Sequence, residues 1–225
     1  LMTVHTVLKA NQNLNEILTV KSKLHNHTRL VRGMKLTRLD LMKLSLVYSD
    51  NLAAVTLSEN YPGGQEAFMR QMNENSKELG MTNTYFGDPT GLDSDNSSTI
   101  TDISTLTNTV SKYQIVRDAA KMENLTVSAT KGKKTVKIKV NPTSKFFGHD
   151  NIIAIKTGFT NAAGFCITML LHSNDKIYNL VVLGAHSSKE RKKIIEASLN
   201  SINIDSKEDK YIKPMKRQHH RHHYG

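Results

Sequence analysis

The stretch Ile155-Lys156-Thr157-Gly158-Phe159-Thr160 lies in the part of the sequence that decides the fold. It belongs to a nearly continuous apolar region in which we expect three strands, over residues 152–157, 164–172 and 177–185. Such runs are typical of strands that are covered on both faces. We therefore expect a sheet here, packed against helices on either side.

Helical patterns flank the expected sheet. Thr37 and Ser187 each precede an apolar helical pattern and have an acidic residue three positions later, which is an N-terminal capping signal. The helix over residues 1–10 has no such cap, so its first amides lack side-chain partners, and we expect a further segment before it. The other expected helices run from Thr37, from Ala53, over 66–79, over 101–113 and from Ser187 to about Ile202, the last with Ile194, Ile195 and Leu199 facing inward.

Residues 125–130 and 135–140 alternate between apolar and polar side chains, which predicts a hairpin with one dry and one wet face. Together the patterns indicate an α/β chain, in which helices flank a sheet. We expect one domain over residues 1–204. Residues 205–225 are rich in Lys, Arg and His, and we expect a flexible tail there.

The composition excludes several classes of protein. With 225 residues, 38% hydrophobic and 23% charged, the chain has the make-up of a globular protein, and no apolar run approaches a membrane span or a signal peptide. The net charge of +11 favours anionic partners, but basic stretches with interleaved aromatic residues are missing, so we expect no nucleic acid. The lone Cys166 lies in an apolar run and is expected to be a buried thiol.

Two polar tripeptides carry the chemical information. Ser49-Asp50-Asn51 interrupts a helical pattern, as a loop or helix start facing a cleft would, and Lys156-Thr157-Gly158 follows 107 residues later. Active-site serine enzymes that act on D-alanyl peptides and β-lactams carry Ser-x-x-Lys, Ser-x-Asn and Lys-Thr-Gly in this order. Here no Ser-x-x-Lys precedes Ser49.

These motifs and their surroundings resemble the D-alanyl-D-alanine carboxypeptidases of the S11 serine-peptidase type, the low-molecular-mass penicillin-binding proteins. The likeness runs from Leu1 to about Ile202, and Leu1-Met2-Thr3 looks like the residues that directly follow the family's Ser-x-x-Lys. Further similar segments are Gly33–Thr37, Ser49–Ala54, Phe68–Asn73, Leu79–Phe86, Ile155–Cys166, Leu183–Ala185 and Ser188–Arg191.

The resemblance implies roles in acyl transfer. The family's serine attacks the carbonyl between two D-alanines, Ser49 would relay a proton to the leaving amine, and Asn51 would bind the substrate's amide. Lys156 would supply positive charge for the terminal carboxylate and the oxyanion. Four residues of the third motif would bind the substrate: Thr157 through the carboxylate, Gly158 by leaving room beside the strand edge, Phe159 as an oxyanion donor through its amide, and Thr160.

The resemblance implies no metal or cofactor, peptidoglycan peptides and β-lactams as partners, and a periplasmic or extracellular location at the cell envelope. The resemblance also implies an α+β fold, with an antiparallel sheet flanked by helices and a separate helical subdomain. In this fold two N-terminal strands flank the strand over 177–185, and without them that strand is a sheet edge, which an upstream segment or a partner chain would cover. His186 stands where some relatives have Arg, and a histidine cluster (His219, His220, His222, His223) lies in the tail.

Two classes of function therefore remain open. The first is a serine D-Ala-D-Ala carboxypeptidase or endopeptidase, of which these 225 residues alone are expected to be inactive. The second is a non-catalytic protein of the same descent that binds peptidoglycan or serves in assembly, for example in a phage or the envelope.

Overall fold

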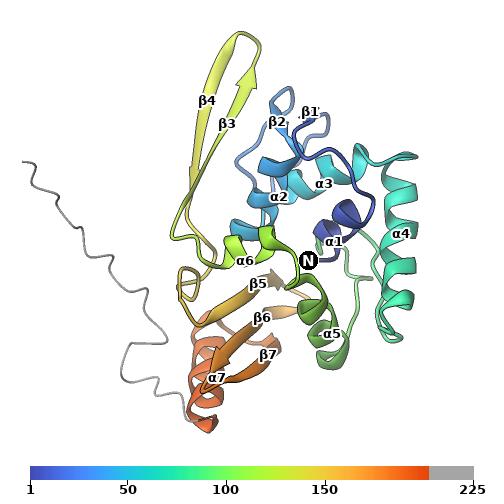
Figure 1. The fold of residues 1–225 in the computed structure, drawn as a ribbon. Coiled ribbons are helices and arrows are strands. Elements are labelled where there is room, and N and C mark those ends of the chain that lie inside the picture. Colours follow the sequence, from blue (N-terminus) through green and yellow to red (C-terminus); the bar gives the residue numbers. More distant parts are fainter. Residues whose placement is uncertain (203–225) are drawn as a thin grey trace, which may run out of the picture.

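Three long apolar strands form an antiparallel sheet in the order β5-β6-β7, in the computed structural model of the chain (Figure 1). They are β5 (Ile152–Thr160), β6 (Gly164–Ser173) and β7 (Lys176–Ala185). The register sets Thr157 opposite Ile167, and Met169 opposite Leu180. The sequence prediction of three consecutive antiparallel strands is confirmed.

The outer strands differ from the prediction that all three are covered on both faces. β6 has a long run of buried residues, but β7 exposes Ile177 (66%) and Leu183 (41%). Among the described residues β7 has a neighbour on one side only, so it is an edge strand, as expected from the resemblance. The mixture of exposed, half-buried and buried side chains along β7 is that of a strand covered only in part.

Helices α5 (Ile100–Val110), α6 (Gln114–Ala120) and α7 (Ser188–Ser201) pack against this sheet. α5 meets β6 through a hydrogen bond of 2.7 Å between the hydroxyls of Thr107 and Thr168. α7 begins after the N-cap Ser187, as predicted, and buries Ile195 and Leu199. The prediction for Ile194 is wrong, because this side chain lies at the border of the inward face and is 38% exposed.

The part of the molecule on the other side of β5 is mainly helical, as Figure 1 shows. We call it the helical half. α2 (Arg38–Val47) begins where predicted, because Thr37 Oγ1 accepts a hydrogen bond from the amide of Asp40. The remaining helices are α1 (Met2–Lys9), α3 (Asn51–Glu59) and α4 (Gly64–Glu78). Sequence reasoning missed α6, since it has only seven residues and no side-chain cap.

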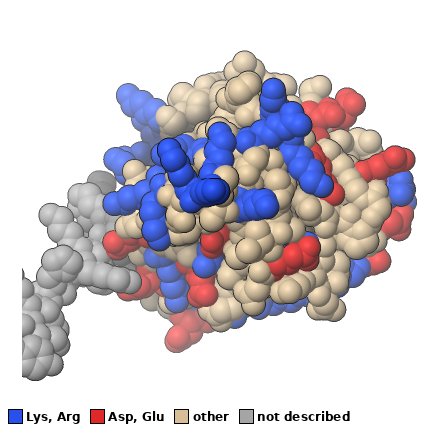
Figure 2. All heavy atoms as spheres, turned by 90° about the horizontal axis from the view of Figure 1, so that it is seen from above, with Lys and Arg blue, Asp and Glu red and all other residues tan. Residues whose placement is uncertain are grey.

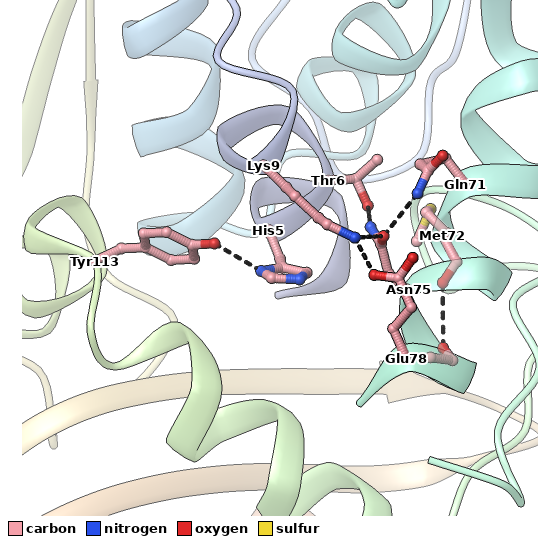
Figure 3. A network of polar contacts seen from close by, with 9 residues as sticks. His5, Thr6, Lys9, Gln71, Met72, Asn75, Glu78 and Tyr113 are labelled. Atoms are coloured by element: carbon pink, nitrogen blue, oxygen red, sulfur yellow. Dashed lines mark hydrogen bonds and ion pairs between the residues drawn. The ribbon is translucent and has the colours of Figure 1, made fainter. Parts of the chain in front are cut away.

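A polar network fixes α1 against α4 and the segment after α5 (Figure 3). The buried Asn75 donates to Thr6 Oγ1 (3.0 Å) and accepts from Gln71 (2.8 Å) and Lys9 (3.1 Å). Lys9 also pairs with Glu78, and His5 Nδ1 lies 2.8 Å from the hydroxyl of Tyr113. Burial, with smaller contributions from Lys112 and Lys9, lowers the pKa of His5 to about 4, so the imidazole is neutral at pH 7.

A four-stranded antiparallel sheet in the order β1-β2-β3-β4 completes the molecule, with its long hairpin projecting at the top of Figure 1. The hairpin strands β3 (Leu125–Lys131) and β4 (Lys134–Val140) confirm the prediction. β1 (Ile17–Thr19) and β2 (Lys35–Thr37) were not predicted, because strands of three residues leave no readable alternation.

The structure describes residues 1–202, so the predicted tail and its histidine cluster lie outside the described part. Within residues 1–202, none of the helices combines the length and hydropathy that crossing a bilayer requires.

Candidate active site

A cavity of about 770 Å³ lies where the helical half meets β5. Its walls come from the first turn of α1, the Ser49–Asn51 turn, the loop around residues 86–92 and residues 156–160 of β5. β5 is an edge of its sheet among the described residues, so its outer edge borders this cavity. All seven residues predicted as catalytic or substrate-binding line the cavity.

The two motifs meet through one hydrogen bond. Lys156 Nζ donates to Ser49 Oγ at 2.7 Å and to the carbonyl of Thr157 at 2.7 Å. Burial lowers the pKa of Lys156 to about 8, because a desolvated ammonium is less stable than one in water. The group is therefore mostly cationic at pH 7 and loses its charge about two pH units earlier than an exposed lysine does.

Ser49 is held in a strained backbone conformation. Its φ is +58°, a left-handed value that costs a non-glycine residue on the order of 1 kcal/mol. The residue lies between the end of α2 and Asp50, the N-cap of α3. The tight reversal between the two helices turns the Ser49 hydroxyl toward Lys156.

Asp50, the middle residue of the tripeptide, has a structural role. It is buried, and its Oδ1 accepts from the amide of Ala53, which caps α3, and from the hydroxyl of Thr28 at 2.7 Å. Its Oδ2 accepts from the amide of Arg29 at 2.9 Å. One carboxylate thus ties the start of α3 to the loop over residues 26–29.

Asn51 is oriented by the same loop. Its Nδ2 donates to the carbonyl of Asn26 at 3.0 Å, and its backbone amide donates to the carbonyl of His27. The His27 ring stacks on Tyr48 with centroids 4.3 Å apart, and Asn26 and His27 both line the cavity. Sequence reasoning missed this loop, because nothing in its composition marks it as part of the site.

The third motif lies along β5. Thr157 is buried, and its hydroxyl is 2.5 Å from that of Thr143, a cavity residue that the sequence did not reveal. Gly158 and Phe159 are exposed in the cavity, and Thr160 Oγ1 accepts from the amide of Ala163 in the turn to β6.

Gly158 has no structural reason to be glycine within the chain. A Cβ there would meet only Cys166 Cβ, at an ordinary 3.8 Å, and the backbone is not in the left-handed region. The absence of a side chain at this point leaves free space beside the strand edge. This is the property that the resemblance assigns to Gly158.

Cys166 corrects a prediction. It is half-buried and lines the cavity opposite Gly158, because the glycine that pairs with it on β5 has no side chain to cover the thiol. Next to it, Phe159 and Phe165 stack with centroids 4.3 Å apart, and the Arg191 guanidinium lies 5.7 Å from the Phe165 ring. Arg191 Nη1 donates to the carbonyl of Cys166, and burial lowers the pKa of this guanidinium.

Two Ser-x-x-Lys tetrapeptides do occur later in the chain, at Ser128–Lys131 and Ser173–Lys176. The first lies on β3 and the second spans the turn from β6 to β7, and neither contributes a residue to the cavity. Neither can therefore supply the nucleophile of this site in the described structure.

Comparison with known proteins agrees with the geometry. The family model for D-alanyl-D-alanine carboxypeptidases, peptidase S11, matches residues 1–187. The chain belongs to this family. It is 36% identical over 195 residues to the D-alanyl-D-alanine endopeptidase of Escherichia coli (strain K12), covering 82% of this chain and 61% of that protein. This family member thus spans about three fifths of the length of that relative.

Solved structures show the same fold. The Streptomyces K15 DD-transpeptidase matches with a TM-score of 0.81 and 22% identity, over 88% of this chain and 83% of that one. Penicillin-binding protein D2 from Listeria monocytogenes, in its cefotaxime-bound form, matches with a TM-score of 0.73 and 26% identity, over 88% and 83% of the two chains. The predicted family and α+β fold are confirmed.

Proposed function

We propose that this chain forms the substrate-binding and proton-relay part of a serine D-Ala-D-Ala peptidase that acts on peptidoglycan stem peptides in the cell envelope. The observation that supports this most directly is the 2.7 Å hydrogen bond between Lys156 Nζ and Ser49 Oγ inside the cavity. A cation that is hydrogen-bonded to a hydroxyl can exchange a proton with it and pass the proton to a leaving amine.

The rest of the site fits a peptide with a free carboxylate. Lys156 supplies the charge and Thr157 a hydroxyl for the terminal carboxylate. The Nδ2 of Asn51 is occupied by Asn26, which leaves its carbonyl oxygen to accept the amide N–H of the peptide. The free edge of β5 beside Gly158 provides backbone groups for an extended peptide, in the manner of an added strand.

The roles of Phe159 and Thr160 follow from the same placement. The Phe159 amide, at the end of the motif, is the donor proposed for the oxyanion, and Thr160 shapes the wall by holding the turn to β6. β-Lactams, which mimic the D-Ala-D-Ala carboxylate and carbonyl, are proposed to bind in the same cavity.

Peptide binding tests the proposal without requiring turnover. N-acetyl-D-Ala-D-Ala is titrated into the 225-residue chain, and its C-terminal amide and its L-Ala-L-Ala enantiomer serve as matched controls. We expect binding of the D,D-acid, with a loss of tenfold or more for the amide, since the carboxylate meets Lys156. Equal binding of acid and amide would contradict the proposed carboxylate site.

Acylation tests the enzymatic half. Intact mass spectra of the native protein before and after penicillin treatment are expected to show one penicilloyl adduct, which peptide mapping then places on a serine other than Ser49. An adduct on Ser49 would refute its role as a relay. Peptide binding by the native protein without any adduct would favour the non-catalytic alternative.

A further inference from the structure

Two long segments of this chain carry no carboxylate. Residues 17–39 and 124–149 each contain six Lys or Arg residues and not one Asp or Glu, although the whole chain has 20 acidic residues. Exposed charges of both signs are usually interspersed on protein surfaces. The segregation is therefore a feature that requires a structural account.

The fold brings both segments into one sheet. β1 and β2 come from the first segment, β3 and β4 from the second, and β2 pairs with β3 at Lys35 and Thr130. Figure 2 looks down on this end of the molecule, where Lys and Arg gather on one side of the view and most carboxylates lie nearer its rim.

The register fixes which side chains share the outer face. Residues paired across neighbouring strands point to the same side, so Lys35, Thr130 and Thr135 form one row. The next rows on the same side pair Ser128 with Lys137 and Thr126 with Lys139. The opposite side carries the apolar residues of β3 and β4 and, at the tip of the hairpin, the pair Lys131 and Lys134 that flanks the turn. We call the outer side, with the hairpin turn and the β1–β2 loop beside it, the basic face; its exposed cations are Lys21, Lys23, Arg29, Arg32, Lys35, Lys131, Lys133, Lys134, Lys137 and Lys139.

The charges of the basic face are not neutralised within the described residues. Five ion pairs are present among the described residues, and none of them includes one of the ten cations of the basic face. Within residues 17–39 and 124–149 the one basic side chain in an ion pair is that of Arg38, which is buried and bound to Glu16. Lys137 Nζ donates only to Ser128 Oγ at 2.8 Å. The face therefore presents a field of unpaired positive charge to solvent.

The basic face reaches the mouth of the cavity. Arg29 donates to the carbonyl of Lys139 at 3.3 Å, which holds the β1–β2 loop against β4. The same loop presents Asn26 and His27 to the cavity. A ligand lying along the basic face would thus end beside the peptide site.

We propose that the basic face binds a flexible linear polyanion. Lys137 and Lys139 are two positions apart on β4, so their stems leave the strand about 7 Å apart, as a row of point charges suited to a chain of regularly spaced anions. Beside them on β3 lie Ser128, opposite Lys137, and Thr126, opposite Lys139, and their hydroxyls can donate to phosphate or carboxylate oxygens.

The face fits two other anionic partners less well. Its outer rows carry no aromatic side chain on which bases could stack and no Asn or Gln to read their edges, which disfavours nucleic acid. The hairpin turn, Lys131-Gly132-Lys133-Lys134, has no apolar residue that could insert between lipids, and the exposed apolar side chains beside it, Ile17 on β1 and Val31 in the β1–β2 loop, are single residues and form no apolar stripe.

Charge neutralisation with a matched control tests the proposal in the full 225-residue chain. The face variant carries Lys133→Gln, Lys137→Gln and Lys139→Gln; the control variant carries Lys176→Gln, Lys189→Gln and Lys193→Gln, exposed lysines on the β6–β7 turn and α7. Both variants lose the same charge and keep the same C-terminal residues. Thermal unfolding checks that both are folded.

Binding is measured against long-chain inorganic polyphosphate and poly-L-glutamate over a series of salt concentrations. For the face variant we expect at least tenfold weaker binding at physiological salt and a slope of log affinity against log salt that is smaller by about 2 to 3, since each lost contact removes roughly 0.7–0.9. The control variant should change affinity less than about twofold. Which polymer binds more tightly distinguishes phosphate from carboxylate as the source of the anion.

Three results would overturn the proposal. Equal losses in the two variants would show that net charge alone is sensed. Tighter binding of duplex DNA, or of vesicles containing anionic lipid, than of both polymers would assign the face to another class of partner. Absence of salt-dependent binding to either polymer would show that the basic face is not a polyanion site. None of these outcomes bears on peptide binding in the cavity, which is measured separately.

Discussion

Lys156 Nζ donates a hydrogen bond to Ser49 Oγ across 107 residues of sequence, and this contact joins the helical half of the molecule to the strand edge. Ser49 adopts a left-handed backbone conformation, which destabilises the fold, and its hydroxyl makes the contact with Lys156. The two contributions can be separated by substitution.

Replacing Ser49 with glycine and with alanine separates the cost of the left-handed backbone from the role of the hydroxyl group. Both variants lose the contact with Lys156, so both, made in the native protein, are expected to lose acylation by penicillin at least tenfold in rate. Only glycine adopts φ near +58° without strain, so Ser49→Gly should be more stable than Ser49→Ala by about 1 kcal/mol. Urea unfolding measures the difference; equal stabilities would show that the turn relaxes.

The depressed pKa of Lys156 predicts how peptide binding depends on pH. Burial lowers this pKa to about 8, so the ammonium is charged below that pH and neutral above it. Affinity for a D-Ala-D-Ala carboxylate should therefore be constant from pH 6 to 7 and fall as the pH rises through about 8. Calorimetric titration at several pH values checks this, and a Lys156→Met variant should bind weakly at every pH. A wild-type affinity that is unchanged up to pH 10 would be incompatible with a carboxylate held by Lys156.

Gly158→Ala tests whether the space beside β5 is reserved for a ligand. The added methyl group meets only Cys166 Cβ at 3.8 Å, so the free energy of unfolding should change by less than about 1 kcal/mol. Peptide affinity should fall about tenfold, since the methyl group occupies the path of the proposed added strand. Gly164→Ala is the contrasting variant, because a Cβ there would lie 2.8 Å from the carbonyl of Ala185 and should destabilise the fold.

Asp50→Ala is expected to act through folding. It removes the cap of α3 and leaves the Thr28 hydroxyl and the Arg29 amide without their acceptor, at a cost of about 2–4 kcal/mol. Asp50→Asn keeps one acceptor oxygen and should cost about half as much or less. Urea denaturation of the two variants gives the comparison, and an Asp50→Ala protein as stable as the parent would refute the structural role.

The buried His5 predicts a loss of stability in acid. Its folded pKa of about 4 lies below the usual 6.5, so between these values the unfolded chain binds a proton that the folded chain does not. This contribution makes stability decline as the pH falls from about 6.5 to about 4, by at most about 1.4 kcal/mol per pH unit. The free energy of unfolding is measured with urea at a series of pH values for the parent and for His5→Phe, and the difference between the two profiles gives the contribution of His5. Identical slopes for the two proteins between pH 4 and 6.5 would contradict this prediction.

Sequence reasoning located the parts of this site that leave a local pattern. Lys156 and Ser49 belong to tripeptides of fixed order, and Thr37 and Ser187 mark helix starts through a capping contact that lies within four residues. These features are local: the structure has both helix starts where they were predicted, and it brings Ser49 and Lys156 together in one cavity.

The parts that were missed depend on contacts between distant segments. Asn26 and His27 reach the cavity because Asp50 fixes their loop, and Thr143 does so because its hydroxyl meets Thr157. Cys166 was predicted to be buried from its apolar neighbours, whereas its exposure depends on the empty space at Gly158 on the adjacent strand. No pattern within a short window contains this information.

The separation of Ser49 from Lys156 also bears on the order of events during synthesis. A chain that leaves the ribosome from its N-terminus has α1, the loop at residues 26–29 and the Ser49 turn long before β5 exists. Contacts between such distant segments form late, because the intervening chain must first be ordered. The β5 wall of the cavity is therefore completed last, and we expect a nascent chain that ends before residue 160 to bind no D-Ala-D-Ala peptide.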